Sequence, residues 1–382
     1  MKIVNIALCC PYNEGWGYHE NLLPKWQRKN GNEVTLITTR FKNNTESNQS
    51  DIVPTENYIN KEKVKIIRLD WLFNIWPIRI LRIYKSLYHT IEQEKPDFIF
   101  IHGSQFIDAS TVCKYLKNHP NVRAVADNHA DLTNSAKSLM AKILHKTFWK
   151  YTTNKLNKYI QCFYGVLPIR CEFIEKMYNI PKDRIKPLYM GIDDELIESS
   201  KSNIDHIKNK YSINNNTINI VSGGKFDDYK KEILNLMKVI NNNKNYKLYI
   251  YGSVSNNIKE QFESLLSDNV KYVGWLNQLD SYTLLSACDV AVFPGRHSVI
   301  WEQCVGLGVP LIVRRWSGTE HVNINNNCIF IENGSEEEIN KMINSPSFFD
   351  IIKNLKTSAK IESTKQVFSY KEIAKISIDT YN

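Results

Sequence analysis

The sequence has no apolar run long enough to cross a bilayer, since none reaches the roughly 18 to 20 residues that a spanning helix needs. Its first residues, MKIVNIALCCPYNEG, hold one lysine and a short apolar run, followed by proline and polar residues. This start lacks the length and the small-residue cleavage site of a signal peptide. We therefore expect a cytoplasmic protein, with peripheral contact to the inner face of the cell membrane as an open alternative.

The sequence also lacks paired cysteine motifs. Eight cysteines stand at positions 9, 10, 113, 162, 171, 288, 304 and 328, and none forms a C-x-x-C pair. This spacing favours free, mostly buried thiols in a reducing compartment. The acidic pairs at 193–194 and 227–228 have no further spaced ligands, so we expect no metal site.

Two common nucleotide motifs are missing as well. A dinucleotide fingerprint beginning at Gly15 and Gly17 would need a third glycine where Glu20 stands, and no Walker A loop occurs. The formal net charge is nevertheless +9, with a pI near 8.9, which favours anionic partners such as nucleotides or phospholipid surfaces. Because the basic residues are spread along the chain, we expect no nucleic-acid partner.

Short β-rich apolar runs alternate with helical patterns through most of the 382 residues, which is typical of parallel α/β sheets. The expected strands are 3–10, 33–39, 64–69, 98–103, 123–127 and 164–169, then 218–224, 246–252, 270–276, 289–295 and 310–314. The expected helices are 18–30, 77–94, 106–118 and 133–158, then 231–242, 257–267, 278–287, 298–306 and 336–344. Two series separated by a Pro-, Asn- and Ser-rich crossing at 179–217 predict two domains.

The predicted fold class is therefore α/β, with two doubly wound Rossmann-like domains that face each other across a cleft. We expect an acceptor-side domain over residues 1–190 and a nucleotide-sugar-binding domain over 191–365. We expect the last helix, 366–382, to return to the first domain.

Polar residues follow several of the expected strands. Gly15 and Gly17 precede a helix and permit close approach of an anion, although they are equally compatible with an ordinary loop. His129, in VADNHADL, stands among polar residues at a strand end, where a core histidine is the alternative.

The second domain repeats this arrangement in VSGGKFDDYKK. Gly223 and Gly224 end a strand, Lys225 follows, and Lys230 and Lys231 open the next helix. Lysines beside a helix N-terminus suit a diphosphate without a metal. The alternative is that these lysines are solvated residues at the entry of the helix.

A third polar cluster lies in FPGRHSVIWEQ. Arg296, His297 and Ser298 enter a short helix, and Glu302 follows about one turn later. The first three residues could donate to phosphate or sugar hydroxyls, and Glu302 could accept from the vicinal hydroxyls of a ribose. The alternatives are a packed loop histidine and a partly buried acid paired with an arginine.

Taken in order, GWGYHENLLPKWQRKNGNEVTLIT, VADNHADL, IPKDRIKPLYMGID, SGGKFDDYKK, YVGW and FPGRHSVIWEQCVGLGVPLIV resemble glycosyltransferase family 4 over nearly the whole chain. The resemblance implies the GT-B fold and transfer from a nucleotide-sugar with retention. It implies that no cofactor is needed besides this co-substrate and that no metal is needed.

By position, the resemblance places Gly15 near the donor phosphate and His129 beside the reacting sugar. It places Lys225 where the family usually has arginine, with Lys230 or Lys231 as the next basic residue. Glu302 matches the second glutamate of the family's E-x7-E motif, but Pro294 stands at the first. That departure leaves the transferred sugar open.

The resemblance thus makes His129, Lys225 and Glu302 the expected catalytic residues. It implies a hexosyltransferase that builds a cell-surface glycan, such as a capsule or the O-antigen of lipopolysaccharide, on a glycan or lipid-linked acceptor. Two alternatives stay open: a nucleotide-sugar epimerase or phosphorylase on the same fold, and a non-catalytic binding protein.

One further segment bears on a membrane partner. Residues 68–91 interleave arginine and lysine with tryptophan, tyrosine and leucine. Such a segment could rest on an anionic bilayer, or it could be a helix that packs its apolar stripe on a sheet.

Overall fold

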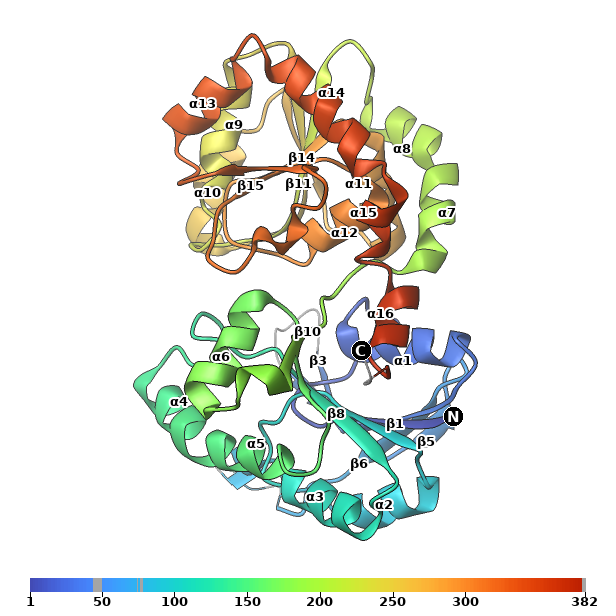
Figure 1. Ribbon diagram of the computed structural model, residues 1–382. Coiled ribbons are helices and arrows are strands. Elements are labelled where there is room, and N and C mark those ends of the chain that lie inside the picture. The colour runs from blue at the N-terminus through green and yellow to red at the C-terminus, as the bar shows by residue number, and fades with distance from the viewer. Residues whose placement is uncertain (44–49, 74, 76–77, 380–382) are drawn as a thin grey trace. The chain divides into compact units, whose positions relative to one another are not determined.

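The chain folds into two α/β units, each a mostly parallel sheet with helices on both faces (Figure 1). The structure is a computed structural model that describes residues 1–43, 50–73, 75 and 78–379. Unit 1 comprises Met1–Tyr189 together with the chain from Tyr370 on, and unit 2 comprises Met190–Ser369. The predicted pair of Rossmann-like domains is confirmed. Within the described ranges, every helix is too short or too polar to span a bilayer.

The sheet of unit 1 has eight strands, and every neighbouring pair is parallel except β5 with β6. Their order is β10 (Ile185–Pro187), β9 (Phe163–Gly165), β8 (Arg123–Asn128), β7 (Phe98–Ile101), β1 (Lys2–Ala7), β2 (Glu33–Thr39), β6 (Lys65–Leu69) and β5 (Asn57–Ile59). A separate antiparallel pair is formed by β3 (Phe41–Asn43) and β4 (Ser50–Ile52).

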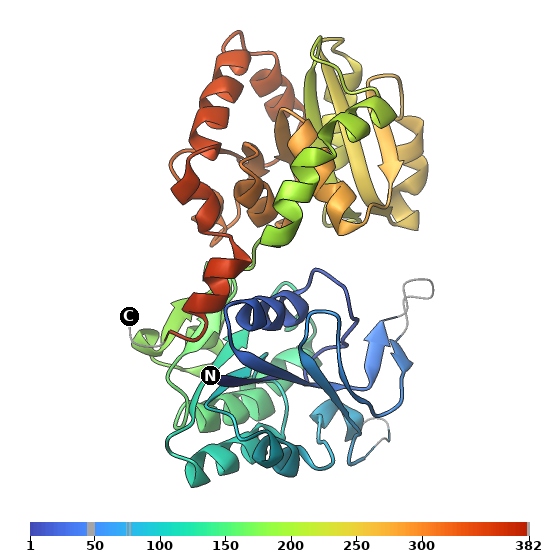
Figure 2. The same cartoon turned by 90° about the vertical axis from the view of Figure 1, so that its right-hand side faces the viewer.

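Both faces of this sheet are covered, because successive strand residues point to opposite sides. In β7, Phe98 and Phe100 pack with α1 (His19–Lys29) and α16 (Tyr370–Ile376). Ile99 and Ile101 pack on the other side. The helices on that side include α2 (Leu87–Glu94), α3 (Ala109–Asn118), α5 (Lys150–Leu156) and α6 (Pro168–Tyr178). The last helix, α16, thus lies beside the first, α1 (Figure 2).

Unit 2 has a six-stranded sheet that is parallel throughout. Its order is β13 (Val270–Gly274), β12 (Tyr246–Val254), β11 (Ile218–Phe226), β14 (Val290–Phe293), β15 (Leu311–Arg314) and β16 (Cys328–Ile331). One face carries α9 (Ile233–Asn241), α10 (Asn256–Ser264), α13 (Glu336–Ile343) and α14 (Phe348–Ala359). A second group joins α7 (Asp194–Ser202), α8 (Ile204–Tyr211), α11 (Gln278–Ala287), α12 (Ile300–Leu307) and α15 (Glu362–Gln366).

The structure corrects three expected elements. The crossing predicted at 179–217 contains α7 and α8, whose polar faces resemble linker composition. The strand expected at 164–169 ends at Gly165, because Pro168 opens α6 with a backbone angle suited to a helix start. The helix expected at 77–94 is a 3-10 turn (Ile78–Leu81) and then α2, while residue 77 itself lies outside the described residues.

In each sheet the strand order reverses at one point, which is where open α/β sheets bind ligands, at the carboxyl ends of the strands. In unit 1 the chain turns back between β1 and β7, and in unit 2 it turns back between β11 and β14. The residues that follow these four strands therefore hold the candidate sites.

Candidate functional site

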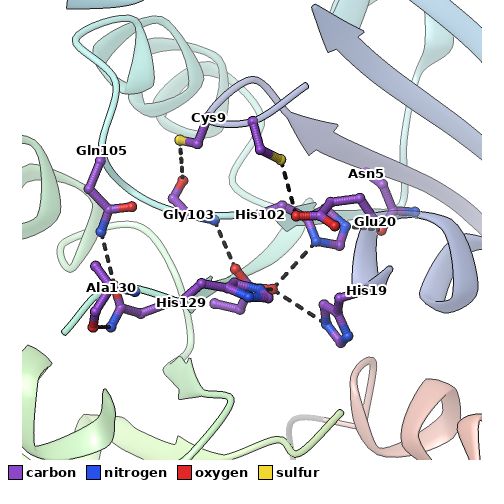
Figure 3. A network of polar contacts seen from close by, with 12 residues as sticks. Asn5, Cys9, His19, Glu20, His102, Gly103, Gln105, His129 and Ala130 are labelled. Carbon is purple, nitrogen blue, oxygen red and sulfur yellow. Dashed lines mark hydrogen bonds and ion pairs between the residues drawn. The ribbon is translucent and has the colours of Figure 1, made fainter. Parts of the chain in front are cut away.

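A buried carboxylate stands at the reversal point of unit 1, surrounded by three imidazoles (Figure 3). Asp127 ends β8, and its Oδ1 accepts a hydrogen bond from the Gly103 N–H at 2.8 Å. Its Oδ2 lies 3.1 Å from His129 Nε2 and 3.4 Å from both His19 Nε2 and His102 Nδ1. The three histidines come from the loop after β8, the start of α1 and the end of β7.

A second layer of hydrogen bonds orients two of these imidazoles. His102 Nε2 donates to Asn5 Oδ1 at 3.1 Å, and the Asn5 amide donates to Gln27. Gln27 in turn donates to Ser377, just beyond α16. His19 Nδ1 lies 3.0 Å from the hydroxyl of Tyr370, in α16. The last residues of the chain therefore help to hold a site that the first residues build.

The shared carboxylate divides the imidazoles into two kinds. Burial lowers the pKa of His19 well below its usual value, more than the nearby Asp127 raises it. Partial burial alone would also lower the pKa of His129, but the charge of Asp127 and the hydrogen bond to it outweigh burial and raise this pKa. Burial alone would raise the pKa of Asp127, yet His129 and His102 hold it well below its usual range. The arrangement thus favours an ion pair of Asp127 with a protonated His129.

His129 is the imidazole of this cluster that faces open space. Its side chain is 32% exposed, against 0% for His19 and 1% for His102. It lines a cavity of about 410 Å³ within unit 1, together with Cys9, Cys10, Glu20, Ile80, Arg82, His102, Gly103, Gln105, Ala130, Asn134, Ser135, Ala141, Leu144, His145 and Trp149. A polar molecule in this cavity could contact both His129 and the Glu20 carboxylate.

In unit 2, the predicted residues Gly224, Lys230 and Ser298 come together. A Cβ built on Gly224 would lie 3.7 Å from Lys230 Nζ and 3.9 Å from Ser298 Oγ. Gly224 has a φ of 126°, in the region that favours glycine, so its backbone is exposed to both side chains. Burial lowers the pKa of Lys230, and within the described part of the chain its ammonium forms no ion pair.

The remaining predicted basic residues lie in different surroundings. Lys225 and Lys231 are exposed. The guanidinium of Arg296 lies near two aromatic rings, 4.4 Å from the centroid of Tyr229 and 5.4 Å from that of Trp316. Such cation–π contacts use the face of a guanidinium, and the N–H donors of Arg296 point along its edge.

Glu302 is fully buried in α12, where it accepts hydrogen bonds from two histidines. His297 Nε2 and His321 Nε2 each lie 2.8 Å from Glu302 Oε1. Burial alone would raise the pKa of Glu302, but His297 and then His321 hold it well below its usual range. The expected alternative of an arginine partner is not what the structure shows, and the predicted contact of Glu302 with sugar hydroxyls stays a prediction.

Two groups of side chains have a composition that could hold a metal ion: His19, His102 and Asp127, and His297, Glu302 and His321. Tetrahedral zinc with bonds near 2.0 Å separates its ligand atoms by about 3.3 Å. The 3.4 Å spacing in unit 1 is compatible with that edge, whereas the 2.8 Å contacts in unit 2 are hydrogen bonds. In unit 1 the charge of Asp127 is already balanced by His129.

The sequence did not point to His19, His102, Asp127 or His321. His19 and His102 had a usable signal, since each is a histidine next to a strand end or helix start. His321 lies in a 3-10 turn (Glu320–Val322) that no periodicity marks. Gly15 has a φ of 79°, which fits a tight turn, and the structure shows no further link between Gly15 or Gly17 and the His129 cluster.

Two family comparisons match successive parts of the chain. Residues 20–196 match Glycosyltransferase Family 4, and residues 203–347 match Glycosyl transferases group 1. Together these matches cover every strand of both units except β1. A protein from Klebsiella pneumoniae described as "Uncharacterized 41.2 kDa protein in cps region" is 27% identical over 128 residues. The match covers 32% of each protein, so the chain spans about a third of that relative.

Solved structures share the fold over nearly the full length of the chain. A glycosyltransferase from Rickettsia africae ESF-5 has a TM-score of 0.71 at 14% identity, covering 100% of this chain and 97% of that one. HepE from Anabaena, in complex with UDP-glucose, has a TM-score of 0.67 at 14% identity, covering 100% and 99%. WaaG, described as involved in lipopolysaccharide biosynthesis, has a TM-score of 0.59 at 15% identity, covering 98% and 100%.

Proposed function

The chain is a two-domain glycosyltransferase of the GT-B type, and we propose that it moves a sugar with retention from a nucleotide-sugar to a cell-surface glycan. Unit 2 binds the donor and unit 1 binds the acceptor in this proposal. The titles of HepE and WaaG support it, because one structure contains UDP-glucose and the other enzyme acts in lipopolysaccharide biosynthesis. The Klebsiella relative from a cps region supports a capsular or related glycan.

The observation that carries the donor site is the half-buried ammonium of Lys230. It faces the backbone of Gly224 and the Ser298 hydroxyl, and among the described residues no carboxylate forms an ion pair with it, although the charge of Asp227 acts on it from farther away. Burial outweighs Asp227 and disfavours the ammonium, so an anionic ligand in direct contact would stabilise it. The diphosphate of a nucleotide-sugar supplies that charge.

The same residues would act during transfer. As the bond between the sugar and the diphosphate breaks, negative charge grows on the leaving phosphate, and Lys230, Ser298 and the amides at the start of α12 would stabilise it. Lys225 adds a further cation at the edge of β11. The leaving phosphate can take the proton of the acceptor hydroxyl, so no separate protein base is required.

Arg296 would contact the transferred sugar, since it lies two residues after Pro294, which stands at the position of the family's first glutamate. In unit 1, His129 would act as a protonated imidazole that donates a hydrogen bond to the reacting sugar. The protein would act in the cytoplasm, at the inner face of the membrane where the acceptor is assembled.

The test compares two neighbouring lysines. Lys230→Ala should weaken UDP binding at least about tenfold, because it removes a charged hydrogen bond worth roughly 1.5 to 3 kcal/mol. Lys231→Ala removes an exposed lysine next to it and should change UDP affinity less than about twofold. Isothermal titration with UDP, UDP-glucose and UMP measures both. Equal effects of the two substitutions, or no UDP binding by the unmodified protein, would contradict the UDP site.

A further inference from the structure

The helical segment that follows His129 exposes an unusual group of large apolar side chains. Six of them lie within 20 residues: Leu132, Leu139, Met140, Ile143, Phe148 and Tyr151. Leu139 and Met140 are 76% and 70% exposed. Single exposed apolar residues need no explanation, but a contiguous group marks an interaction surface.

This surface is also strongly basic. Residues 132–158 contain six lysines, at positions 137, 142, 146, 150, 155 and 158, and no aspartate or glutamate. The segment therefore carries a formal charge of +6, which is two thirds of the chain's +9. A surface that combines lysines with exposed leucine, methionine, phenylalanine and tyrosine is complementary to an anionic bilayer.

Five of these six side chains belong to one continuous helical segment, and Leu132 precedes it. The helix runs through α4 (Leu139–Leu144), a π-helical turn (His145–Trp149) and α5. His145, Trp149 and Leu156 face inward and belong to the packed interior of unit 1. The exposed residues are therefore not needed for the core.

The same helix also forms a wall of the cavity that contains His129. Ala141, Leu144 and Trp149 line that cavity, and Ile80 and Arg82 line it as well. Arg82 holds its guanidinium 5.9 Å from the Trp149 ring centroid and donates to the Gln105 carbonyl. A molecule anchored in a bilayer beneath the helix would thus reach a cavity with cationic, acidic and imidazole groups.

We propose that residues 132–151 dock on an anionic bilayer and present the cavity of His129 to an acceptor carried by a lipid. This inference rests on the proposed glycosyltransferase function and names the class of its acceptor. It moves the membrane contact away from 68–91, which also exposes Leu72, Phe73, Ile75, Ile78 and Ile80.

The basic groups of that other segment are engaged within the protein. Asp70 pairs with Arg40 and Lys85, and the Arg79 guanidinium lies over the Phe41 and Trp71 rings. Residues 74, 76 and 77 of the segment lie outside the described residues. The described part of 68–91 could lie beside the docking surface. Its formal charge is only +3, from four basic residues and Asp70, against +6 in 132–158.

Co-sedimentation with vesicles tests the proposal on the full chain. The protein should bind vesicles with 30% phosphatidylglycerol in phosphatidylcholine and not pure phosphatidylcholine, and binding should weaken in about 0.5 M salt. The pair Lys142→Glu and Lys146→Glu should reduce binding at least about thirtyfold, since each lysine near an anionic surface contributes about 1 kcal/mol. The matched pair Lys353→Glu and Lys360→Glu makes the same charge change on exposed lysines of unit 2 and should reduce binding less than about threefold.

A second pair tests the apolar part. Leu139→Ser with Met140→Ser should lower binding about tenfold or more, whereas Trp275→Ser with Phe349→Ser, which alters exposed residues of unit 2, should not. Equal losses in the matched pairs, equal binding to neutral vesicles, or no binding of the unmodified protein would overturn the docking surface. Titration with UDP separates the two proposals. The docking variants should keep the UDP affinity of the unmodified protein. If the unmodified protein does not bind UDP, the proposed UDP site is contradicted and the docking surface is not.

Discussion

Each unit of the protein buries one carboxylate among histidines, but the two carboxylates are satisfied differently. Asp127 uses both oxygens, with the Gly103 amide on Oδ1 and the three imidazoles around Oδ2. Glu302 receives two imidazoles on Oε1, while its buried Oε2 has no hydrogen-bond partner among the described residues.

This difference predicts a different role for each carboxylate. Both oxygens of Asp127 have a hydrogen-bond partner, and we expect it to act through His129, the most exposed histidine of its cluster, which lines a cavity. The Oε2 of Glu302 is a buried acceptor without a hydrogen-bond donor among the described residues. Such an acceptor would be stabilised by a hydrogen bond from a ligand hydroxyl or from a rearranged side chain. The first acid positions a histidine, and the second is incomplete until something binds.

The largest expected effect is that of Asp127→Asn. Removing the charge leaves a protonated His129 without its counter-ion, and breaking a buried ion pair costs about 3 to 5 kcal/mol. We expect a loss of about 3 kcal/mol in unfolding free energy and at least a hundredfold drop in sugar transfer, measured by urea denaturation and by turnover. UDP affinity should stay within about twofold, because the proposed donor site lies in unit 2. A variant with unchanged turnover would show that Asp127 does not position His129.

The next effect is that of Glu302→Gln, which makes the same charge change in the other unit. Replacing a charged acceptor by an amide weakens the bonds from His297 and His321, and charged hydrogen bonds contribute roughly 1.5 to 3 kcal/mol. Affinity for UDP-glucose should fall about tenfold to a hundredfold in calorimetric titration. If a folded variant binds UDP-glucose as tightly as the unmodified protein, Glu302 does not belong to the donor site. Asp127 and Glu302 would then differ only in how much each contributes to the stability of the protein.

A smaller effect separates the imidazoles of unit 1 by pH. The raised pKa of His129 contributes stability that is fully present below pH 6.5 and is lost as pH rises through the folded value. The lowered pKa of His19 acts on the other side, since its contribution is lost as pH falls below 6.5.

His129→Gln should therefore flatten the fall in unfolding free energy between pH 6.5 and 8, by no more than about 1 kcal/mol. The decline below pH 6.5 should remain. Denaturation curves at pH 5.5, 6.5 and 8 measure both slopes. The depressed pKa of Glu302 adds stability that is lost only as pH falls below about 4.3, so Glu302 itself should not titrate over this range. Identical slopes in the variant and the unmodified protein would contradict an ion pair at His129.

The smallest expected effect is that of chelation. His129 balances the charge of Asp127, and Lys230 would supply the cation at the proposed donor site. Removing divalent metal with EDTA should therefore change turnover and UDP affinity less than about twofold. Melting temperature and zinc content, measured before and after dialysis, extend the test to the His19, His102 and Asp127 group, whose spacing is compatible with zinc. A fall in melting temperature that zinc restores would show that this group binds a metal.

Much of the fold was predictable, because parallel strands covered on both faces are continuous apolar runs. The strand 33–39 and the helix 278–287 were placed at their observed bounds. Short elements such as β10 and β16, and helices with polar faces such as α7 and α8, were missed because periodicity in so few or so polar residues is weak.

The candidate site was predictable only where its residues stand at strand ends or helix starts. Gly224, Lys230 and Ser298 each stood at a strand end or helix start, and the sheet brings them together. The partnership of Glu302 with His321 joins residues 19 apart through a 3-10 turn, and that of His19 with Tyr370 joins residues 351 apart. Such pairs depend on tertiary packing, which no local pattern records.

The return of α16 to unit 1 has a consequence for taking the protein apart. Unit 2 is one uninterrupted stretch of chain, and the backbone bond from Ile192 to Phe368 holds its two ends beside each other. In topology, unit 2 is an insertion within unit 1, so a stop codon after residue 189 would yield a fragment without Tyr370 and Ser377. A chain in which residue 189 is joined to residue 370 by a short linker would keep both residues and would remove unit 2 as one continuous stretch.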